Sequence, residues 1–188
     1  MSEFQTSTRV GDLPEPDADA QAHAGRLRAV IEQLIDTRGG AIGFDAYMQA
    51  ALYAPGLGYY SAGSRKFGAE GDFVTAPEVS PLFARCLARQ CVSVLRAVGN
   101  ADILEVGAGS GIMAAELLHE LAALDCLPQR YLILEVSPDL RVRQRQTLAR
   151  VAPDLADRVV WLDTLPATPI RGCVLANEVV DALPVRCF

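Results

Sequence analysis

A glycine-rich turn near the middle of the chain contains the residues with the clearest chemical use. The apolar run ILEV, which ends after Glu105, is followed by GAGSG, so glycines alternate with small residues at Gly107, Gly109 and Gly111. Between a strand and a helix N-terminus, such a turn lets a nucleoside-bearing cofactor approach bare backbone. The dinucleotide fingerprint G-x-G-x-x-G, counted from Gly107, requires a third glycine at position 112, where this chain has isoleucine. The spacing disfavours a nicotinamide dinucleotide, and a merely structural turn stays open as the alternative.

Polar side chains also follow the next three predicted strands. Glu135, Asp163 and Asn177 each come directly after a short apolar run. Parallel strands end at one edge of a sheet, where the ligand crevice of an open α/β fold lies, so these side chains are expected beside the glycine turn. There Glu135 can accept hydrogen bonds from both ribose hydroxyls, and Asp163 can accept one from an adenine amine. Each residue alone is unremarkable, because strand ends meet water and often carry acids.

The acidity of this edge selects among nucleoside cofactors. Glu105, Glu135, Asp163, Glu178 and Asp181 are all expected near one crevice. These carboxylates would repel a pyrophosphate or a 2′-phosphate and would suit a cofactor that carries positive charge. S-adenosylmethionine is a sulfonium cation with no phosphate. The sequence therefore favours it over NAD.

The periodicity of the chain predicts the elements that position these residues. Apolar residues at helical spacing indicate helices at about 20–38, 45–53 and 81–98, and Ser80-Pro81 gives the third a typical start. Beyond residue 100, short apolar strands alternate with helices, which predicts a parallel sheet covered on both faces. The strands are expected at about 102–106, 131–135, 158–162 and 173–176, and the intervening helices at 111–124 and 138–151.

The same periodicity predicts a domain boundary near Gly99. Residues 1–19 are expected to form a mobile tail, and 20–99 a helical region with a glycine-rich loop at 61–79. Residues 100–188 then form a partial cofactor-binding α/β domain. The fold class is α/β, with the first four strands of a Rossmann-like sheet preceded by a helical N-terminal region.

Amino-acid composition further limits the ligands and the cellular location that are expected for this chain. The net charge of −6 argues against nucleic-acid binding, and the arginines at 141–150 are expected on a solvated helix face. Five cysteines without a CxxC pair, together with two histidines, favour reduced thiols and no metal site. No apolar run approaches the roughly 20 residues that span a bilayer. Residues 1–19 lack the features of a signal or transit peptide, so a cytoplasmic location is expected.

The motifs resemble those of class I S-adenosylmethionine-dependent methyltransferases, through ILEVGAGSG, Glu135 and ANE at 176–178. More narrowly, the chain resembles the MidA-like family, which includes mitochondrial complex I assembly factors that act as protein arginine methyltransferases. The matching segments cover nearly everything from residue 42 onward; they are FDAYMQAALYAPGLGYYS, GDFVTAPEVSPLF, LEVGAGSGIMAAELL, YLILEVSPDLRVRQRQTL and ANEVVDALPVRCF.

The resemblance implies roles for individual residues. The three turn glycines would admit the methionine portion of S-adenosylmethionine, with Glu135 on the ribose and Asp163 on the adenine. The family's GDFVTAPE signature would close over the cofactor site, and its polar candidates are Asp72, Thr75 and Glu78. In the alternative reading, Thr75 and Glu78 bond local backbone. The cofactor-binding set is Glu105, Gly107, Gly109, Gly111, Glu135, Asp163, Asn177, Asp72 and Thr75.

The candidate catalytic residues are Glu178 and Asp181. A carboxylate can orient an acceptor guanidinium by charge-assisted hydrogen bonds, and a short helix after the fourth strand would place both acids on one face. Equally, the two acids could stabilise that helix N-terminus through its dipole.

Length is the main departure from the family pattern. MidA-like proteins are about twice as long, so the chain is expected to be a truncated member, with doubtful activity by itself. Its exposed sheet edge could allow self-association. A protein substrate with an acceptor arginine is expected. A non-catalytic assembly module and, less favoured, a nicotinamide-dependent oxidoreductase remain as alternative functions.

Overall fold

The computed structural model describes residues 15–62 and 74–187, which fall into two compact units. The first unit is Met1–Ala62 with Pro184–Phe188, and the second is Gly63–Leu183. The division therefore falls well before Gly99, the boundary expected from the sequence. The reason is the helix that precedes Gly99, which packs on the sheet-bearing part of the chain.

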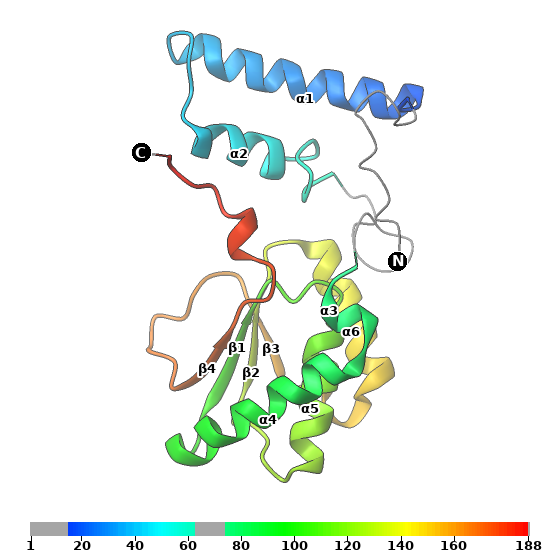
Figure 1. Cartoon of the computed structure of the whole chain (residues 1–188), viewed down its shortest axis with the longest axis vertical. Helices are drawn as coiled ribbons and strands as arrows, with labels where there is room; N and C mark the ends of the chain where they lie inside the picture. The colour runs from blue at the N-terminus through cyan, green and yellow to red at the C-terminus, as the bar shows by residue number, and fades with distance from the viewer. Residues whose placement is uncertain (1–14, 63–73, 188) are drawn as a thin grey trace, which may run out of the picture. The chain divides into compact units, whose positions relative to one another are not determined.

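The first unit contains two helices, α1 (Ala18–Thr37) and α2 (Phe44–Tyr53), which contact each other (Figure 1). The Asp17 side chain begins α1 by accepting a hydrogen bond from the backbone N–H of Ala20 at 2.8 Å. Arg186 donates to the Asp45 carboxylate of α2 at 2.9 Å, which ties the C-terminal segment into this unit. Both helices lie where the apolar periodicity predicts them.

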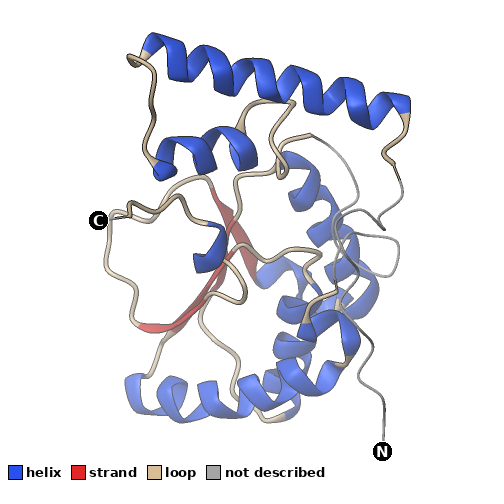
Figure 2. Ribbon diagram, turned by 45° about the horizontal axis from the view of Figure 1, so that its top comes forward, coloured by secondary structure: helices blue, strands red, loops and turns tan. Residues whose placement is uncertain are grey.

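The second unit is built on a four-stranded parallel sheet in the order β3-β2-β1-β4. This confirms the predicted α/β class. Strands are drawn in red and helices in blue in Figure 2. The strands are β1 (Asp102–Val106), β2 (Tyr131–Leu134), β3 (Val159–Leu162) and β4 (Gly172–Leu175). All four lie within a residue or two of their predicted positions.

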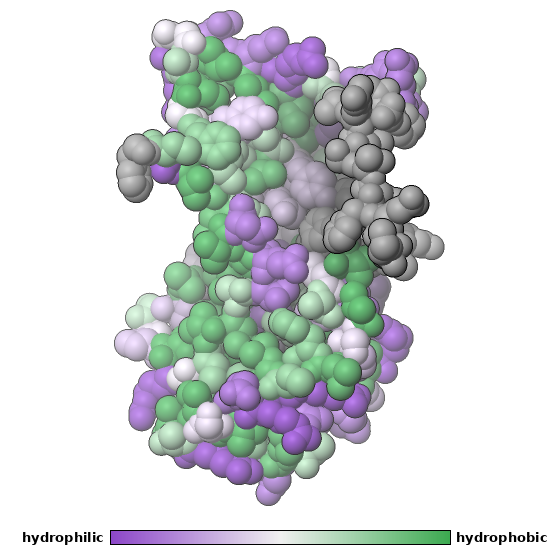
Figure 3. Space-filling view, in the orientation of Figure 1, coloured by the Kyte–Doolittle hydropathy of each residue, from purple (hydrophilic) through white to green (hydrophobic). Residues whose placement is uncertain are grey.

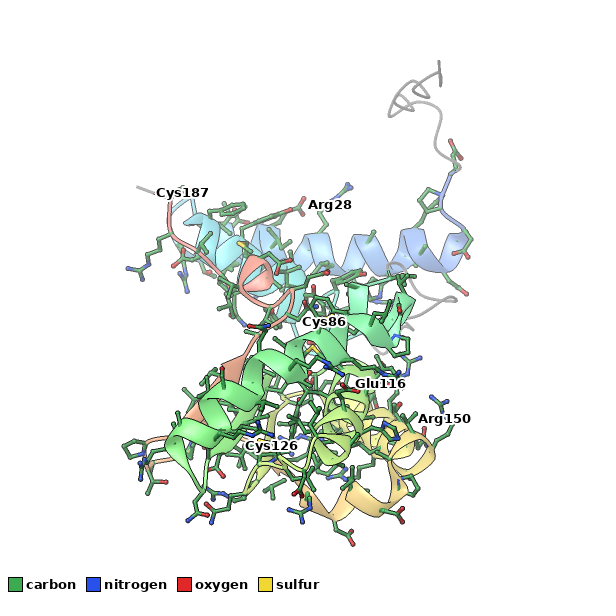
Figure 4. The ribbon with its side chains drawn as sticks, turned by 60° about the horizontal axis from the view of Figure 1, so that its bottom comes forward. Arg28, Cys86, Glu116, Cys126, Arg150 and Cys187 are labelled. Carbon is green, nitrogen blue, oxygen red and sulfur yellow. The ribbon has the colours of Figure 1, made fainter. Side chains whose placement is uncertain are left out.

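Two helices alternate with these strands, as the change of period predicts: α5 (Ile112–Ala123) follows β1 and α6 (Pro138–Val151) follows β2. Helices α3 (Ala76–Val79) and α4 (Pro81–Val98) precede β1, and the 3₁₀ turns η2 (Pro153–Arg158) and η3 (Val180–Ala182) precede β3 and follow β4. Ser80 and Ser137 accept hydrogen bonds from backbone N–H groups at the starts of α4 and α6. Helix α4 packs on α5, and Glu116 of α5 forms an ion pair with Arg85 of α4 at 3.3 Å (Figure 4).

The two faces of the sheet differ in how well they are covered. One face contributes Ile103, Tyr131 and Ile133 to the apolar core, together with buried residues of α4, α5 and α6. On the other face the central Leu104 and Leu132 are buried, whereas Val160 and Val174 of the outer strands are exposed. The expected cover on both faces is therefore complete on one face only, within the part of the chain that the structure describes.

Apolar side chains also reach the surface of the second unit outside the sheet (Figure 3). The exposed ones include Val79, Leu82 and Val180. None of the helices in residues 15–62 and 74–187 combines the length and the apolar character needed to cross a membrane. All five cysteines are free thiols.

Candidate functional site

The glycine turn joins β1 to α5 with three left-handed glycines. Gly107, Gly109 and Gly111 have φ of 65°, 53° and 82°, a region that side chains disfavour. A Cβ on Gly111 would lie 2.9 Å from the Cα of Gln144 in α6, and one on Gly107 would lie 3.0 Å from Val179. At Gly111 the neighbouring backbone and the left-handed conformation both require glycine, whereas at Gly107 the left-handed conformation is the main constraint, because the Val179 methyl can shift slightly.

Glu135, at the end of β2, is held by the protein on both of its carboxylate oxygens. Only 5% of the residue is exposed. Its Oε1 accepts a hydrogen bond from the backbone N–H of Ser137 at 3.0 Å, and its Oε2 accepts one from Nε2 of Gln144 at 3.1 Å. Since an ionised carboxylate offers about four acceptor positions, each oxygen keeps acceptor capacity for a ligand.

Gln144 is a residue that the sequence reasoning missed. It is fully buried in α6, and its Nε2 donates to the backbone carbonyl of Gly109 at 3.1 Å as well as to Glu135. Its Oε1 accepts a hydrogen bond from Nε1 of Trp161 in β3 at 2.8 Å. One side chain thus joins the glycine turn, the end of β2 and β3. The signal in the sequence is weak: Gln144 lies one turn before Leu148, on the apolar side of a helix rich in arginine.

Asp163, after β3, lies at the surface in an ion pair. Its side chain is 88% exposed, and Oδ1 is 2.8 Å from Nη1 of Arg141, whose side chain is only 18% exposed. Arg141 also donates to the backbone carbonyls of Glu135 and Leu162, both at 2.7 Å. Arg141 thereby holds the ends of β2 and β3 together. The expectation of a simply solvated arginine face is wrong for this residue, because α6 lies across the ends of both strands.

Glu105, the acid at the end of β1, points into the core. It is buried and accepts a hydrogen bond from the hydroxyl of Tyr131 at 2.6 Å. Burial raises the pKa of Glu105 to about 7, against the lowering effect of the Tyr131 hydrogen bond, and the nearby Glu135 raises it further. Burial and the adjacent Glu105 also raise the pKa of Tyr131. The carboxyl of Glu105 therefore interacts with Tyr131, inside the fold.

The GDFVTAPE signature reaches the glycine turn through its last residue. Glu78, in α3, accepts a hydrogen bond from the hydroxyl of Ser110 in the turn. The reading in which Glu78 only bonds local backbone through its side chain is therefore wrong. Thr75 is half-buried and precedes α3, where its carbonyl accepts from the backbone N–H of Glu78 at 2.9 Å. Asp72 lies outside the described residues.

The side chains of the segment after β4 are more exposed to solvent than Glu135. Asn177 is half-buried, whereas Glu178 and Asp181 are exposed and form no hydrogen bond or ion pair with the described residues. Glu178 has a φ of 50°, which is costly for a residue with a side chain. The expected short helix with both acids on one face is wrong. Glu178 takes the left-handed conformation before the turn begins, and η3 spans only Val180–Ala182.

Comparison with known proteins identifies the family. The family model described as "Putative S-adenosyl-L-methionine-dependent methyltransferase" matches residues 86–188. The chain belongs to this family. It is 31% identical, over 86% of its length, to the protein arginine methyltransferase NDUFAF7 of Danio rerio, of which it covers 43%. It is likewise 31% identical, over 92% of its length, to the Drosophila melanogaster homologue, of which it covers 44%.

A solved structure of the same kind is closer in sequence. A Burkholderia thailandensis protein crystallised with S-adenosyl-homocysteine bound is 50% identical, with a TM-score of 0.85. The match covers 92% of this chain and 45% of that protein. The chain thus spans less than half the length of these relatives.

Proposed function

We propose that this chain forms the S-adenosylmethionine-binding part of a methyltransferase that acts on arginine in a protein substrate. The observation that carries the proposal is the state of Glu135, a nearly buried carboxylate beside a left-handed glycine turn, with acceptor capacity left on both oxygens. A ribose presents two neighbouring hydroxyls, which is the donor pair that such a carboxylate can accept. The S-adenosyl-homocysteine bound to the Burkholderia relative and the names of the NDUFAF7 relatives support the same function.

The charges around the turn favour a cofactor without phosphate. Glu78 contacts the Ser110 hydroxyl of the turn, and Glu135 lies at the end of the neighbouring strand. A pyrophosphate at this turn would meet carboxylates where a dinucleotide site offers free hydroxyls and N–H groups. The positively charged sulfonium of S-adenosylmethionine would instead be attracted by these carboxylates. Together with isoleucine at position 112, these carboxylates disfavour a nicotinamide-dependent oxidoreductase.

The proposed cofactor contacts follow from these positions. Glu135 would accept from the ribose hydroxyls, and the turn at 107–111 would admit the methionine portion. Asp163 would accept from the adenine amine through Oδ2, since Oδ1 pairs with Arg141. Asn177, Thr75 and Asp72 complete the proposed set. Glu105 would contribute indirectly, because its own side chain bonds Tyr131 in the core.

The bound cofactor supplies an electrophilic methyl group on sulfur with a good leaving group, so the protein mainly has to position the reactants. Glu178 and Asp181 are proposed to orient the acceptor guanidinium. Both carboxylates are exposed and unpaired among the described residues, and therefore free to accept from an arginine. A left-handed Glu178 fits this role, because strained backbone is often retained where a side chain has a function.

Binding tests the cofactor part of the proposal. Calorimetric titration of the 188-residue chain with S-adenosylhomocysteine should give saturable binding, and titration with NAD under the same conditions should give much weaker binding or none. Tighter binding of NAD would overturn the cofactor assignment. Incubating the chain with labelled S-adenosylmethionine and arginine-containing protein, followed by mass spectrometry of the acceptor, tests the transfer. Cofactor binding without any transfer to arginine would favour the non-catalytic assembly module.

Location and partners remain predictions. The NDUFAF7 relatives are named as mitochondrial proteins, whereas a cytoplasmic location was expected for this chain. Self-association through a sheet edge, at β3 or β4, and the absence of a nucleic-acid partner were also predicted. Size-exclusion chromatography with light scattering would test self-association.

A further inference from the structure

We propose that Gln144 is a positioning residue of the cofactor site, whose side-chain amide fixes the Glu135 carboxylate relative to the glycine turn. This inference rests on the proposed function, because it gives Gln144 a role in holding S-adenosylmethionine through Glu135. Gln144 does not itself contact the cofactor in this proposal. Its three hydrogen bonds, all between 2.8 and 3.1 Å, carry the argument.

Trp161 decides which way the amide of Gln144 points. An indole N–H can only donate, so the atom 2.8 Å from Nε1 of Trp161 has to be the amide oxygen. The amide nitrogen then faces two acceptors, the carbonyl of Gly109 and Oε2 of Glu135. Both partners match a donor, so the amide orientation is consistent at all three contacts. The neighbouring indole thus prevents the amide from turning over.

This orientation fixes the position of the ribose-binding carboxylate. Gln144 holds Oε2 of Glu135 and the Ser137 backbone N–H holds Oε1, so the plane of the carboxylate is set before a ligand arrives. Its remaining acceptor positions are then directed without a cost in side-chain ordering, which is the general benefit of preorganisation. The second N–H of Gln144 donates to the Gly109 carbonyl, so the distance and orientation between the turn and the carboxylate are fixed.

The backbone of Gln144 is fixed as firmly as its side chain. Its Cα would lie 2.9 Å from a Cβ on Gly111, so α6 and the turn are in direct contact. One turn earlier, Arg141 anchors the same helix to the carbonyls at the ends of β2 and β3. The amide therefore has little freedom to follow the carboxylate if Glu135 moves. It acts as a fixed support.

Gln144→Met tests the proposal, since it keeps the length of the side chain and removes every hydrogen bond. We expect it to weaken S-adenosylhomocysteine binding about tenfold to hundredfold in calorimetry of the 188-residue chain, as for loss of a hydrogen bond to a charged group. Leu148→Val is the matched control. It removes buried volume from the same helix, and its side chain belongs to the apolar core. Its affinity should stay within threefold of wild type.

Fluorescence supplies a readout that general damage to α6 would not reproduce. Trp161 is the chain's single tryptophan, and its N–H is bound to Gln144. In wild type and in Leu148→Val, S-adenosylhomocysteine should change the emission of Trp161; in Gln144→Met that change should be lost at saturating ligand. Trp161→Phe, which lets the amide turn over, should weaken binding by a smaller factor than Gln144→Met.

The outcomes separate this proposal from the function on which it rests. If wild type binds and Gln144→Met binds within threefold of it, or loses no more affinity than Leu148→Val, the role of Gln144 is overturned and the function stands. A Gln144→Met variant that keeps the full ligand-induced emission change would overturn it as well. If wild type itself fails to bind S-adenosylhomocysteine, the proposed function fails and the role of Gln144 fails with it.

Discussion

The ends of β2 and β4 carry acids of the same kind in opposite environments. Glu135, after β2, is nearly buried and accepts a hydrogen bond on each oxygen from Ser137 and Gln144. Glu178 and Asp181, after β4, are exposed and have no hydrogen-bond or ion-pair partner among the described residues. Both ends lie at the same edge of the parallel sheet, since β2 and β4 flank β1.

We propose that this difference separates the cofactor side of the site from the acceptor side. A carboxylate that is already desolvated and oriented binds strongly, because its interactions are weakly screened and need no further ordering. Exposed carboxylates interact weakly with a guanidinium until something removes the water around them. We therefore propose that the cofactor side at β2 is preorganised here. The acceptor side at β4 would depend on the substrate or on additional chain.

Glu135→Ala should produce the largest effect and tests the β2 end directly. It removes two charge-assisted hydrogen bonds to a ribose, each typically about 1.5–3 kcal/mol, so S-adenosylhomocysteine should bind about a thousandfold more weakly. Calorimetry of the 188-residue chain gives the dissociation constants. Glu116→Ala, in the α4–α5 ion pair with Arg85, is a control that should leave the affinity unchanged. A loss of affinity below tenfold for Glu135→Ala would contradict the proposed difference between the ends of β2 and β4.

Glu105→Gln sharpens the contrast by testing the buried acid behind the site. Because the pKa of Glu105 is raised from 4.5 to about 7 in the fold, only the folded state holds the proton between these values. The free energy of unfolding should therefore fall by about 3 kcal/mol as pH rises from about 4.5 to 7, and stay level above that. Gln does not titrate and can still accept from Tyr131.

The measurement is chemical denaturation of wild type and Glu105→Gln at several pH values. Taking the difference in the free energy of unfolding between the two proteins removes the contributions of the other titrating groups. The variant should be the more stable one at pH 8. If wild type gained stability relative to Glu105→Gln as pH rose, the direction of the Glu105 pKa shift would be refuted.

Gly111→Ala tests whether the fit between the turn and α6 is as tight as the geometry indicates. The added Cβ would lie 2.9 Å from the backbone of Gln144, at a φ of 82°, so we expect a loss of about 2 kcal/mol in the free energy of unfolding. Gly25→Ala is the matched control, because that glycine lies within α1 with open space around it. It should raise stability slightly. Equal effects of the two substitutions on the melting temperature would contradict the model of a tight turn.

Glu178→Gln and Asp181→Asn should have the smallest effect on cofactor binding. Since neither carboxylate is fixed by a described partner, we expect the affinity for S-adenosylhomocysteine to change less than threefold in calorimetry. The same substitutions should reduce methyl transfer to arginine in the transfer assay. A large loss of cofactor affinity in either variant would remove the distinction between the two strand ends.

The sequence predicted the elements of the fold well, for reasons that are local. Ser80 and Ser137 mark the starts of α4 and α6, and Gly99 follows the end of α4 with a φ of 60°. Alternating apolar strands and helices identified the parallel sheet. The domain boundary was harder to place, because the buried face of α4 looks the same in sequence whichever unit it packs on.

Of the candidate site, only the placement of residues at the strand ends could be predicted from the sequence, and their roles stay predictions. The ends of the strands are fixed by topology, so the places of Glu135 and Asp163 could be anticipated. Gln144 and Arg141 could not, because their partners lie in the glycine turn, directly after β2 and on β3, and are reached only when α6 crosses the sheet edge. The turn after β4 was mispredicted because the left-handed Glu178 breaks the helical pattern that the spacing of the acids indicated.

Hydrogen–deuterium exchange with and without S-adenosylhomocysteine tests the account most directly, because it reports where on the chain the ligand acts. We predict protection of the turn at 107–111 and of 135–144, with little change at 176–183 in the 188-residue chain. Protection at 176–183 without protection at 135–144 would contradict the claim that the end of β2 is the preorganised cofactor side.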